Sequence, residues 1–150
     1  MSRVSYVNGF YQRHGDALVH VEDRGYQFAD GVYEVCAVLG GKLLDFEGHW
    51  ARLLRSLDGL GIPLRVDKKP LAVILDQVIK RNRLKDGIIY FQMTRGVASR
   101  DHAIAHSPLP SLVVTAKRLD FKGKAALARY GVGAISAPDM RWSRCDVKSI

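Results

Sequence analysis

The chain has 150 residues, of which 47% are hydrophobic, so it can bury a core without metals or disulfides. The N-terminus lacks the apolar run of a signal peptide, and no segment approaches the roughly 20 apolar residues that span a membrane. Cys36 and Cys145 have no surrounding His/Cys cluster, which argues against a metal site and for reduced thiols. We therefore expect a cytoplasmic protein without a membrane segment.

The charge balance favours an anionic partner, because 23 basic and 15 acidic residues give a formal net charge of +8. Nucleic acid is the first candidate. However, the basic residues are spread along the chain, several at helical spacing, and no zinc-finger, helix-turn-helix or glycine-arginine motif is present. Small anions, such as a phosphate ester and a carboxylate, fit this distribution better. We expect no nucleic-acid partner.

The first part of the chain alternates short apolar runs with turn residues, a pattern typical of β-hairpins. Asn8-Gly9 and Gly40-Gly41 are the strongest turn signals. Strands are predicted, in chain order, at Val4–Val7, Phe10–Arg13, Ala17–Val21, Val32–Leu39 and Lys42–Phe46.

The middle of the chain changes to a helical period. One helix is predicted from about Glu47 to Leu60, with stop signals at Gly61 and Pro63. A second is predicted from about Lys68 to Asn82, with Asp67 as a candidate cap. The side chains expected to be buried are Leu53, Leu57 and Leu60 in the first helix and Leu71, Ile74, Leu75 and Val78 in the second.

Strands return after the second helix. Ile88–Thr94 and Ser111–Lys117 are rich in β-branched or aromatic residues, and a basic segment (121–129) leads to a final strand candidate, Tyr130–Ser136. Hairpins followed by helices and then strands predict an α+β fold with an antiparallel sheet and two helices. No Rossmann or phosphate-loop glycine motif is present.

Two clusters contain side chains suited to binding an anion. Arg52 flanks the apolar stripe of its helix, and its rigid fork of donors matches phosphate oxygens. Arg100 and His102 are two residues apart, so in an extended segment they face the same side, as a carboxylate site requires. The alternatives are a surface arginine with a buried stem and a solvated polar loop.

Two further clusters carry other chemistry. Residues 22–35 are dense in charge, aromatic groups and glycine, and a structured turn entering a strand is the alternative interpretation. Lys148 can form a Schiff base with a carbonyl once its amine is neutral, and burial beside a cation such as Arg144 lowers the pKa of an amine. By residue type alone, a lysine near a terminus is usually solvated.

Together, and in this order, the clusters resemble the D-amino acid aminotransferase family of fold-type IV pyridoxal-phosphate enzymes. DRGYQFADGVYEV is similar to that family's N-terminal signature, and HWARLLRS resembles its HxxRL helix. YFQMTRGVASRDH resembles its substrate-loop strand, and RWSRCDVKSI the run that contains its catalytic lysine. The resemblance covers essentially the whole chain.

The resemblance implies a role for each cluster. Lys148 would form the Schiff base with pyridoxal 5′-phosphate and move the substrate proton. Arg52 would bind the cofactor phosphate, while Tyr33, Arg100 and His102 would bind the substrate α-carboxylate. The Arg-x-His pair favours D-alanine, D-glutamate and similar D-amino acids, with an α-keto acid as acceptor. A homodimer is expected, as in the family.

The resemblance also leaves alternatives open. A branched-chain aminotransferase, an aminodeoxychorismate lyase or a non-catalytic truncated fragment would share much of this pattern. Ala29 departs from the glycine expected after Phe28, which adds one methyl group to a tight turn.

The resemblance further implies a longer protein. We expect residues 1–118 to form the small N-terminal α+β domain, and residues 119–150 to form the linker and start of the larger cofactor domain. Family chains continue for about as many residues again and supply the acidic partner of the pyridine nitrogen. Lys148 lies two residues from the end of this sequence. We expect turnover to need that second half, because without it the electron sink lacks the group that keeps the ring nitrogen protonated.

Overall fold

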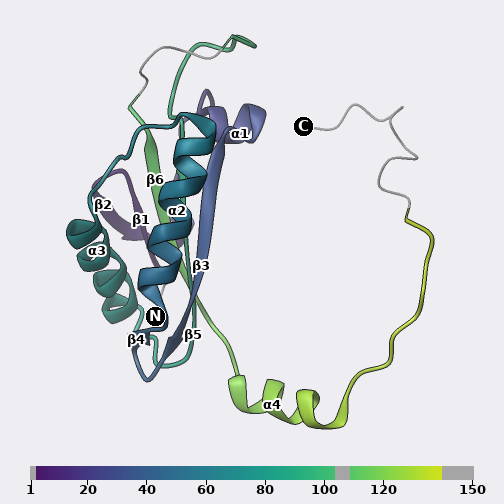
Figure 1. Ribbon diagram of the computed structural model, residues 1–150. Helices are drawn as coiled ribbons and strands as arrows, with labels where there is room; N and C mark the ends of the chain where they lie inside the picture. The colour runs from purple at the N-terminus through teal and green to yellow at the C-terminus, as the bar shows by residue number, and fades with distance from the viewer. Residues whose placement is uncertain (1–2, 104–108, 140–150) are drawn as a thin grey trace. The chain divides into compact units, whose positions relative to one another are not determined.

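A computed structural model describes residues 3–103 and 109–139 of the chain. These belong to two compact units, Met1–Leu119 and Asp120–Ile150. Unit 1 consists of a β-sheet and helices (Figure 1). The described part of unit 2 contains the helix α4 (Phe121–Tyr130), which is followed by residues without regular structure.

Unit 1 is built on one six-stranded sheet in the order β2-β1-β6-β5-β3-β4. Every pair of neighbouring strands is antiparallel. The strands are β1 (Val4–Val7), β2 (Phe10–Arg13), β3 (Gly31–Leu39), β4 (Lys42–Leu43), β5 (Gly87–Thr94) and β6 (Ser111–Arg118). The expected α+β class with an antiparallel sheet is confirmed.

The two long helices, α2 (Phe46–Leu60) and α3 (Lys68–Arg81), pack on the same face of the sheet (Figure 1). The buried side chains between them and the strands include Leu53, Leu57, Leu71, Leu75, Val78, Cys36, Ile89, Phe91 and Val114. Shorter helical segments are η1 (His14–Asp16), a 3₁₀ turn, and α1 (Arg24–Phe28), which leads into β3. Helix periodicity and strand alternation therefore meet in a single core.

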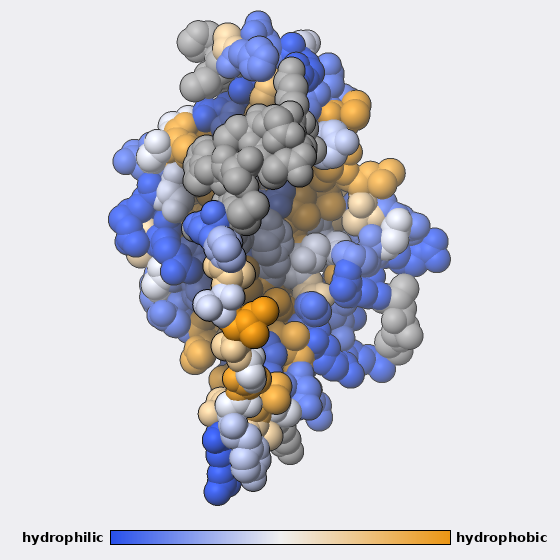
Figure 2. Space-filling model, turned by 90° about the vertical axis from the view of Figure 1, so that its right-hand side faces the viewer, coloured by the Kyte–Doolittle hydropathy of each residue, from blue (hydrophilic) through white to orange (hydrophobic). Residues whose placement is uncertain are grey.

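The other side chains of β3 and β5 lie on the opposite face of the sheet. Tyr33 is directly opposite Gln92 and Val35 is opposite Tyr90, alternating with the buried positions. Tyr33 is 66% exposed. The space-filling view shows apolar surface interspersed with hydrophilic surface on the side of the molecule that it faces (Figure 2).

Two predicted strands near the N-terminus differ from the structure. Ala17–Val21 forms no strand: Leu18 and Val21 are largely exposed, and the chain leaves β2 through the η1 turn without a partner to pair with. The strand predicted at Lys42–Phe46 ends at Leu43. Asp45 then adopts a left-handed conformation and accepts a hydrogen bond from Gly48 N, so that Phe46 begins α2 instead.

Leu60 was expected to be buried and is 45% exposed. Gly61 ends α2 in the left-handed conformation. Its N–H donates a hydrogen bond to Asp58 O, and the N–H of Ile62 donates one to Leu57 O. This cap directs the side chain of Ile62 into the core, where it is 4% exposed. Ile62 therefore occupies the buried position that was predicted for Leu60.

The final strand predicted at Tyr130–Ser136 is also wrong. Tyr130 is the last residue of α4, and residues 131–139 have no regular structure. Gly131 follows the helix at φ +79° and donates to Leu127 O. Val132 and Ile135 are largely exposed, and the described residues of this unit supply no strand to pair with them. The role of this unit as the start of a cofactor domain stays a prediction.

The departure at Ala29 has a clear conformational cost, since the residue ends α1 at φ +53° and ψ +26°. We expect Ala29→Gly to raise the free energy of unfolding by about 0.5–1 kcal/mol, because glycine adopts left-handed geometry without the Cβ clash. Chemical denaturation measures this. Ala51→Gly, on the exposed side of α2, is the matched control and should lower the free energy of unfolding by about 1 kcal/mol. The explanation would be contradicted if both substitutions stabilised the protein, or if neither did.

Candidate active site

The segment that includes α1 and the start of β3 is shaped by close packing against β5. Asp23 caps α1 by accepting a hydrogen bond from Gly25 N at 2.8 Å. A Cβ at Gly25 would lie 2.2 Å from Thr94 Cγ2, and one at Gly31 would lie 3.0 Å from Met93 O. The glycines of this motif are therefore required where the segment touches the end of β5.

Asp30 lies between two buried arginines. Its Oδ2 accepts hydrogen bonds from Arg24 Nε and Arg95 Nε, both at 2.8 Å, and Arg95 Nη2 adds a bond to Oδ1 at 3.1 Å. Arg95 also donates to the carbonyls of Leu60 (2.7 Å) and Gly61 (2.9 Å). Burial alone would raise the pKa of Asp30, but the two arginines outweigh it, so the pKa lies below its ordinary value.

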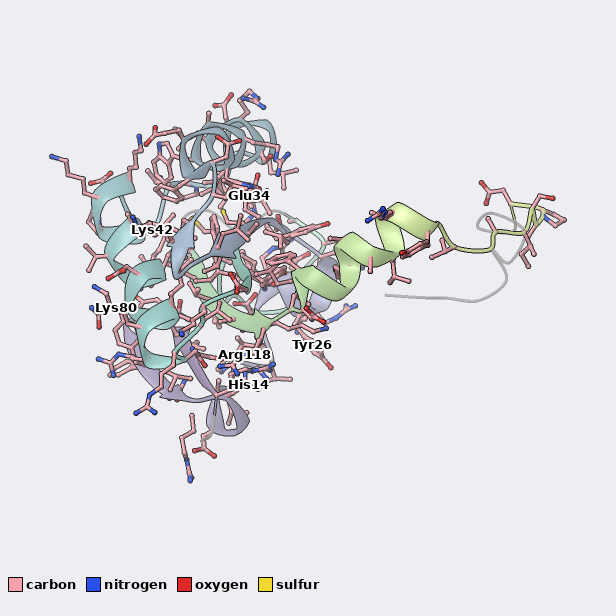
Figure 3. All side chains as sticks on the ribbon, turned by 90° about the horizontal axis from the view of Figure 1, so that it is seen from below. His14, Tyr26, Glu34, Lys42, Lys80 and Arg118 are labelled. Atoms are coloured by element: carbon pink, nitrogen blue, oxygen red, sulfur yellow. The ribbon has the colours of Figure 1, made fainter. Side chains whose placement is uncertain are left out.

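Arg52 is held by a buried carboxylate from the sheet. Arg52 Nε and Nη2 donate to Glu34 Oε1 and Oε2 at 2.6 and 2.7 Å, and His49 Nδ1 donates to Oε2 at 2.7 Å. The Glu34 side chain is 2% exposed and lies at the junction of β3 and α2 (Figure 3), whereas that of Arg52 is 58% exposed. Burial opposes ionisation of Glu34, yet its pKa is lowered because Arg52 and His49 stabilise the anion.

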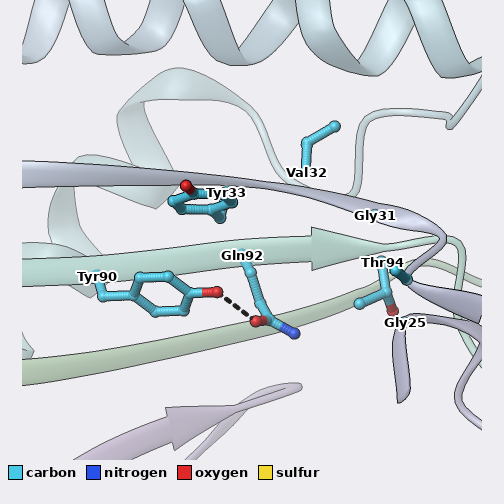
Figure 4. Close-up of a pocket in the computed structure, with 8 residues that line it drawn as sticks. Gly25, Gly31, Val32, Tyr33, Tyr90, Gln92 and Thr94 are labelled. Atoms are coloured by element: carbon cyan, nitrogen blue, oxygen red, sulfur yellow. Dashed lines mark hydrogen bonds between the residues drawn. The ribbon is translucent and has the colours of Figure 1, made fainter. Parts of the chain in front are cut away.

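Tyr33 lies beside a small pocket on the open face of the sheet. The pocket has a volume of about 190 Å³, and its lining consists of Gly25, Ala29, Gly31, Val32, Tyr33, Tyr90, Gln92 and Thr94 (Figure 4). The Tyr33 and Tyr90 rings stack with centroids 5.6 Å apart. Tyr90 OH donates to Gln92 Oε1 at 2.5 Å. The pocket therefore combines aromatic walls with hydroxyl and amide groups, which suits a small polar ligand.

A second pocket, of about 310 Å³, brings Tyr33 and Arg52 together. Its other lining residues are Glu34, Val35 and Ser56. Consecutive residues of β3 point to opposite faces, so Tyr33 reaches this pocket from the open face and Glu34 from the helix face. The pocket therefore lies at the edge of β3, beyond the end of the short strand β4.

Arg100 and His102 both lie in the loop after β5, and both contact the Phe28 ring. Among the residues that the structure describes, no hydrogen bond or ring contact joins this pair to Tyr33 or Arg52. Lys148 lies outside the described residues. The roles assigned to these five residues therefore stay predictions.

Sequence reasoning assigned no role to Glu34, Arg24 or Phe28, although all three lie in the quoted N-terminal motif. Glu34 occupies a core-facing position of its strand, and a carboxylate at such a position needs a cationic partner. That signal would have led from Glu34 to a nearby arginine, and Arg52 is such a residue.

Within residues 3–103 and 109–139, no cluster of three or more His, Cys, Asp or Glu side chains is arranged to hold a metal ion. In the same ranges, no helix combines the length and apolar character that crossing a bilayer requires.

Comparison with known families decides the family of the chain. Residues 31–150 match the family described as amino-transferase class IV. The chain belongs to the class IV aminotransferases. Enzymes of this class use pyridoxal phosphate. The resemblance drawn from the four sequence clusters is thereby confirmed.

Two relatives to which the chain is similar are both named D-alanine aminotransferase. The chain is 40% identical over 143 residues to a D-alanine aminotransferase of Bacillus licheniformis, covering 95% of this chain and 50% of the relative. It is 36% identical over 145 residues to the D-alanine aminotransferase of a Staphylococcus epidermidis strain, covering 97% and 51%. The chain thus spans about half the length of the relatives it matches.

Two solved structures share the fold. A branched-chain amino acid aminotransferase of Escherichia coli superimposes with a TM-score of 0.72 at 19% identity, covering 79% of this chain and 40% of that one. A 4-amino-4-deoxychorismate lyase of Pseudomonas aeruginosa gives 0.60 at 29% identity, covering 76% and 39%. The fold therefore occurs with more than one activity, and residues must decide between them.

The buried ion cluster generates a pH prediction. The pKa of Asp30 is lowered from 3.8, so its contribution to stability is complete above that value and is lost as the pH falls through the lower folded pKa. We expect Asp30→Asn to lower the free energy of unfolding by about 3 kcal/mol at neutral pH, because two buried arginines lose their counter-ion. Denaturation curves should show that the difference in unfolding free energy between wild type and Asp30→Asn becomes smaller below about pH 4.

Asp16→Asn is the control, because the Arg13–Asp16 pair is exposed and contributes less than about 1 kcal/mol. A gap between wild type and Asp30→Asn that stays constant down to pH 2 would rule out ionisation of Asp30 as its source.

Proposed function

We propose that this chain is the lysine-bearing part of a pyridoxal-phosphate aminotransferase that transfers the amino group of a D-amino acid, of the D-alanine or D-glutamate type, to an α-keto acid. The observation that carries the proposal is the 40% identity to a D-alanine aminotransferase across 95% of the chain. The Arg-x-His pair at positions 100 and 102, gathered on one ring, is consistent with it.

The pocket at the edge of β3 suits the phosphate end of the cofactor. Arg52 uses Nε and Nη2 to bind Glu34, which leaves Nη1 of this largely exposed side chain for an anion. Ser56 lies one helical turn further along α2, lines the same pocket and offers a hydroxyl donor. A guanidinium and a hydroxyl on one side of a pocket form a donor set that phosphate oxygens accept. In this proposal Arg52 binds the phosphate.

The pyridine ring of the bound cofactor supplies an electron sink for the bond broken at the substrate Cα. Lys148 would anchor the cofactor and then act as the base that moves the Cα proton. Tyr33, Arg100 and His102 would hold the α-carboxylate in one orientation. Fixing that group determines which Cα bond faces Lys148, and this sets the preference for one enantiomer.

The remaining parts of the proposal concern the complete protein. It would act on small molecules in the cytoplasm as a homodimer, without nucleic acid or a membrane as partner. Membership of the class IV aminotransferases supports this description.

The decisive test compares two reactions of the complete enzyme, that is, the protein at its full natural length. We expect D-alanine and 2-oxoglutarate to yield pyruvate and glutamate, with L-alanine at least about tenfold slower because the fixed carboxylate presents the wrong Cα bond to the base. Lys148→Ala should abolish turnover. Pyruvate release from aminodeoxychorismate without transamination of D-alanine would instead identify a lyase.

Two arginine variants separate the two anion sites. Arg100→Ala should raise KM for the D-amino acid about tenfold or more while cofactor affinity stays unchanged, because it removes a charge-assisted contact to the substrate only. Arg52→Ala should weaken pyridoxal-phosphate binding by a similar factor, measured from the visible absorbance of the bound cofactor. Equal cofactor affinity in Arg52→Ala and wild type would refute the phosphate assignment.

A further inference from the structure

One aromatic ring contacts both residues of the proposed Arg-x-His pair. Phe28 is the last residue of α1 and is half-buried. The guanidinium carbon of Arg100 lies 5.0 Å from the centre of its ring, and the His102 ring lies 5.6 Å away at a tilt of 60°. The guanidinium carbon of Arg24 lies 4.7 Å from the same centre. These distances are within the range of cation–π and aromatic pairs.

Arg24 also holds the backbone of the loop that carries this pair. Its Nη1 donates to the carbonyls of Asp101 and Ala103 at 2.9 and 3.3 Å. Asp101 Oδ1 accepts from Ala103 N at 3.1 Å, which tightens the same turn. Because Arg24 Nε is bound to the partly buried carboxylate of Asp30, the guanidinium cannot move away from the loop without breaking that ion pair.

The start of the loop is aligned by backbone contacts. Arg24 N donates to Gly96 O at 2.9 Å, and Ala98 N donates to Glu22 O at 3.3 Å. Asp23 and Val97 form an isolated antiparallel bridge between these contacts. The residues after β5 therefore run beside the beginning of α1, which brings Arg100 and His102 to the end of that helix.

We propose that Phe28 is a positioning residue, whose ring keeps Arg100 and His102 together so that both face one carboxylate. The inference rests on the proposed function of the pair. Two exposed side chains on a loop otherwise sample separate rotamers, and ligand binding must then supply the free energy of ordering them. The ring face attracts the guanidinium and packs against the imidazole, so both are ordered before the ligand arrives.

The first test measures the loop directly in the 150-residue chain. Trypsin cleaves after Arg100 when that residue is released from the ring. Phe28→Leu should accelerate this cleavage about threefold to tenfold, the factor expected from losing one or two such contacts. Tyr26→Leu is the matched control, since Tyr26 is on the same helix and 61% exposed, and Phe28→Tyr should keep the wild-type rate. Equal cleavage in Phe28→Leu and wild type would overturn the proposal.

The second test uses the complete enzyme. Phe28→Leu should raise KM for the D-amino acid about threefold to tenfold, with kcat and cofactor affinity within about twofold of wild type. In an Arg100→Ala/His102→Ala background the same substitution should have no further effect, because Phe28 acts through those two side chains. A full KM effect in that background, or a fall in kcat alone, would overturn the positioning role.

The two tests also separate this inference from the proposed function. If the complete enzyme transaminated no amino acid, the proposed function would be refuted. The trypsin cleavage rates would still decide whether Phe28 restrains the loop. An active enzyme in which Phe28→Leu loosens the loop without changing KM would leave the function standing and refute substrate positioning.

Discussion

The arrangement of the site depends on one partly buried carboxylate between two buried guanidinium groups. Asp30 binds Arg24 from α1 and Arg95 from the end of β5, and Arg95 also binds the last carbonyls of α2. A charge buried at this point would be strongly unfavourable without its partners. The ion cluster therefore makes the relative positions of α1, β5 and α2 mutually dependent.

The strand β3, which follows Asp30, places side chains with a proposed role on both faces of the sheet. Successive residues of β3 point in opposite directions, so Tyr33 faces the open side while Glu34 faces α2 and holds Arg52. A shift of register by one residue would exchange the two side chains and abolish both arrangements. The eight paired positions between β3 and β5 oppose such a shift.

The same ion cluster also restrains the loop after β5, because Arg24 binds the backbone of that loop. Arg24 connects Asp30 to the carbonyls of Asp101 and Ala103, and the Phe28 ring contacts both Arg100 and His102. Loops that carry binding residues are usually the mobile parts of a fold, and here a rigid element restrains one of them. Binding groups with fewer accessible conformations lose less entropy when a ligand arrives.

Much of the fold follows from local sequence signals. Alternation placed β3, β5 and β6 to within one residue at each end, and the leucine spacing predicted α2 and α3, because these patterns reflect which side chains a core removes from water. Local signals failed at Ala17–Val21 and Tyr130–Ser136, where an apolar run has no neighbouring strand among the described residues. Strand formation needs a partner, and that information is not local.

The four sequence motifs, through their resemblance to a known family, indicated the family and the candidate anion-binding side chains. Only the tertiary structure decided how those side chains are supported: Glu34 binds Arg52, Arg24 binds carbonyls of the loop, and the Phe28 ring contacts both Arg100 and His102. The physical reason is that these contacts join residues as many as 79 positions apart. Such pairs depend on strand register and helix packing, which no single segment of sequence encodes.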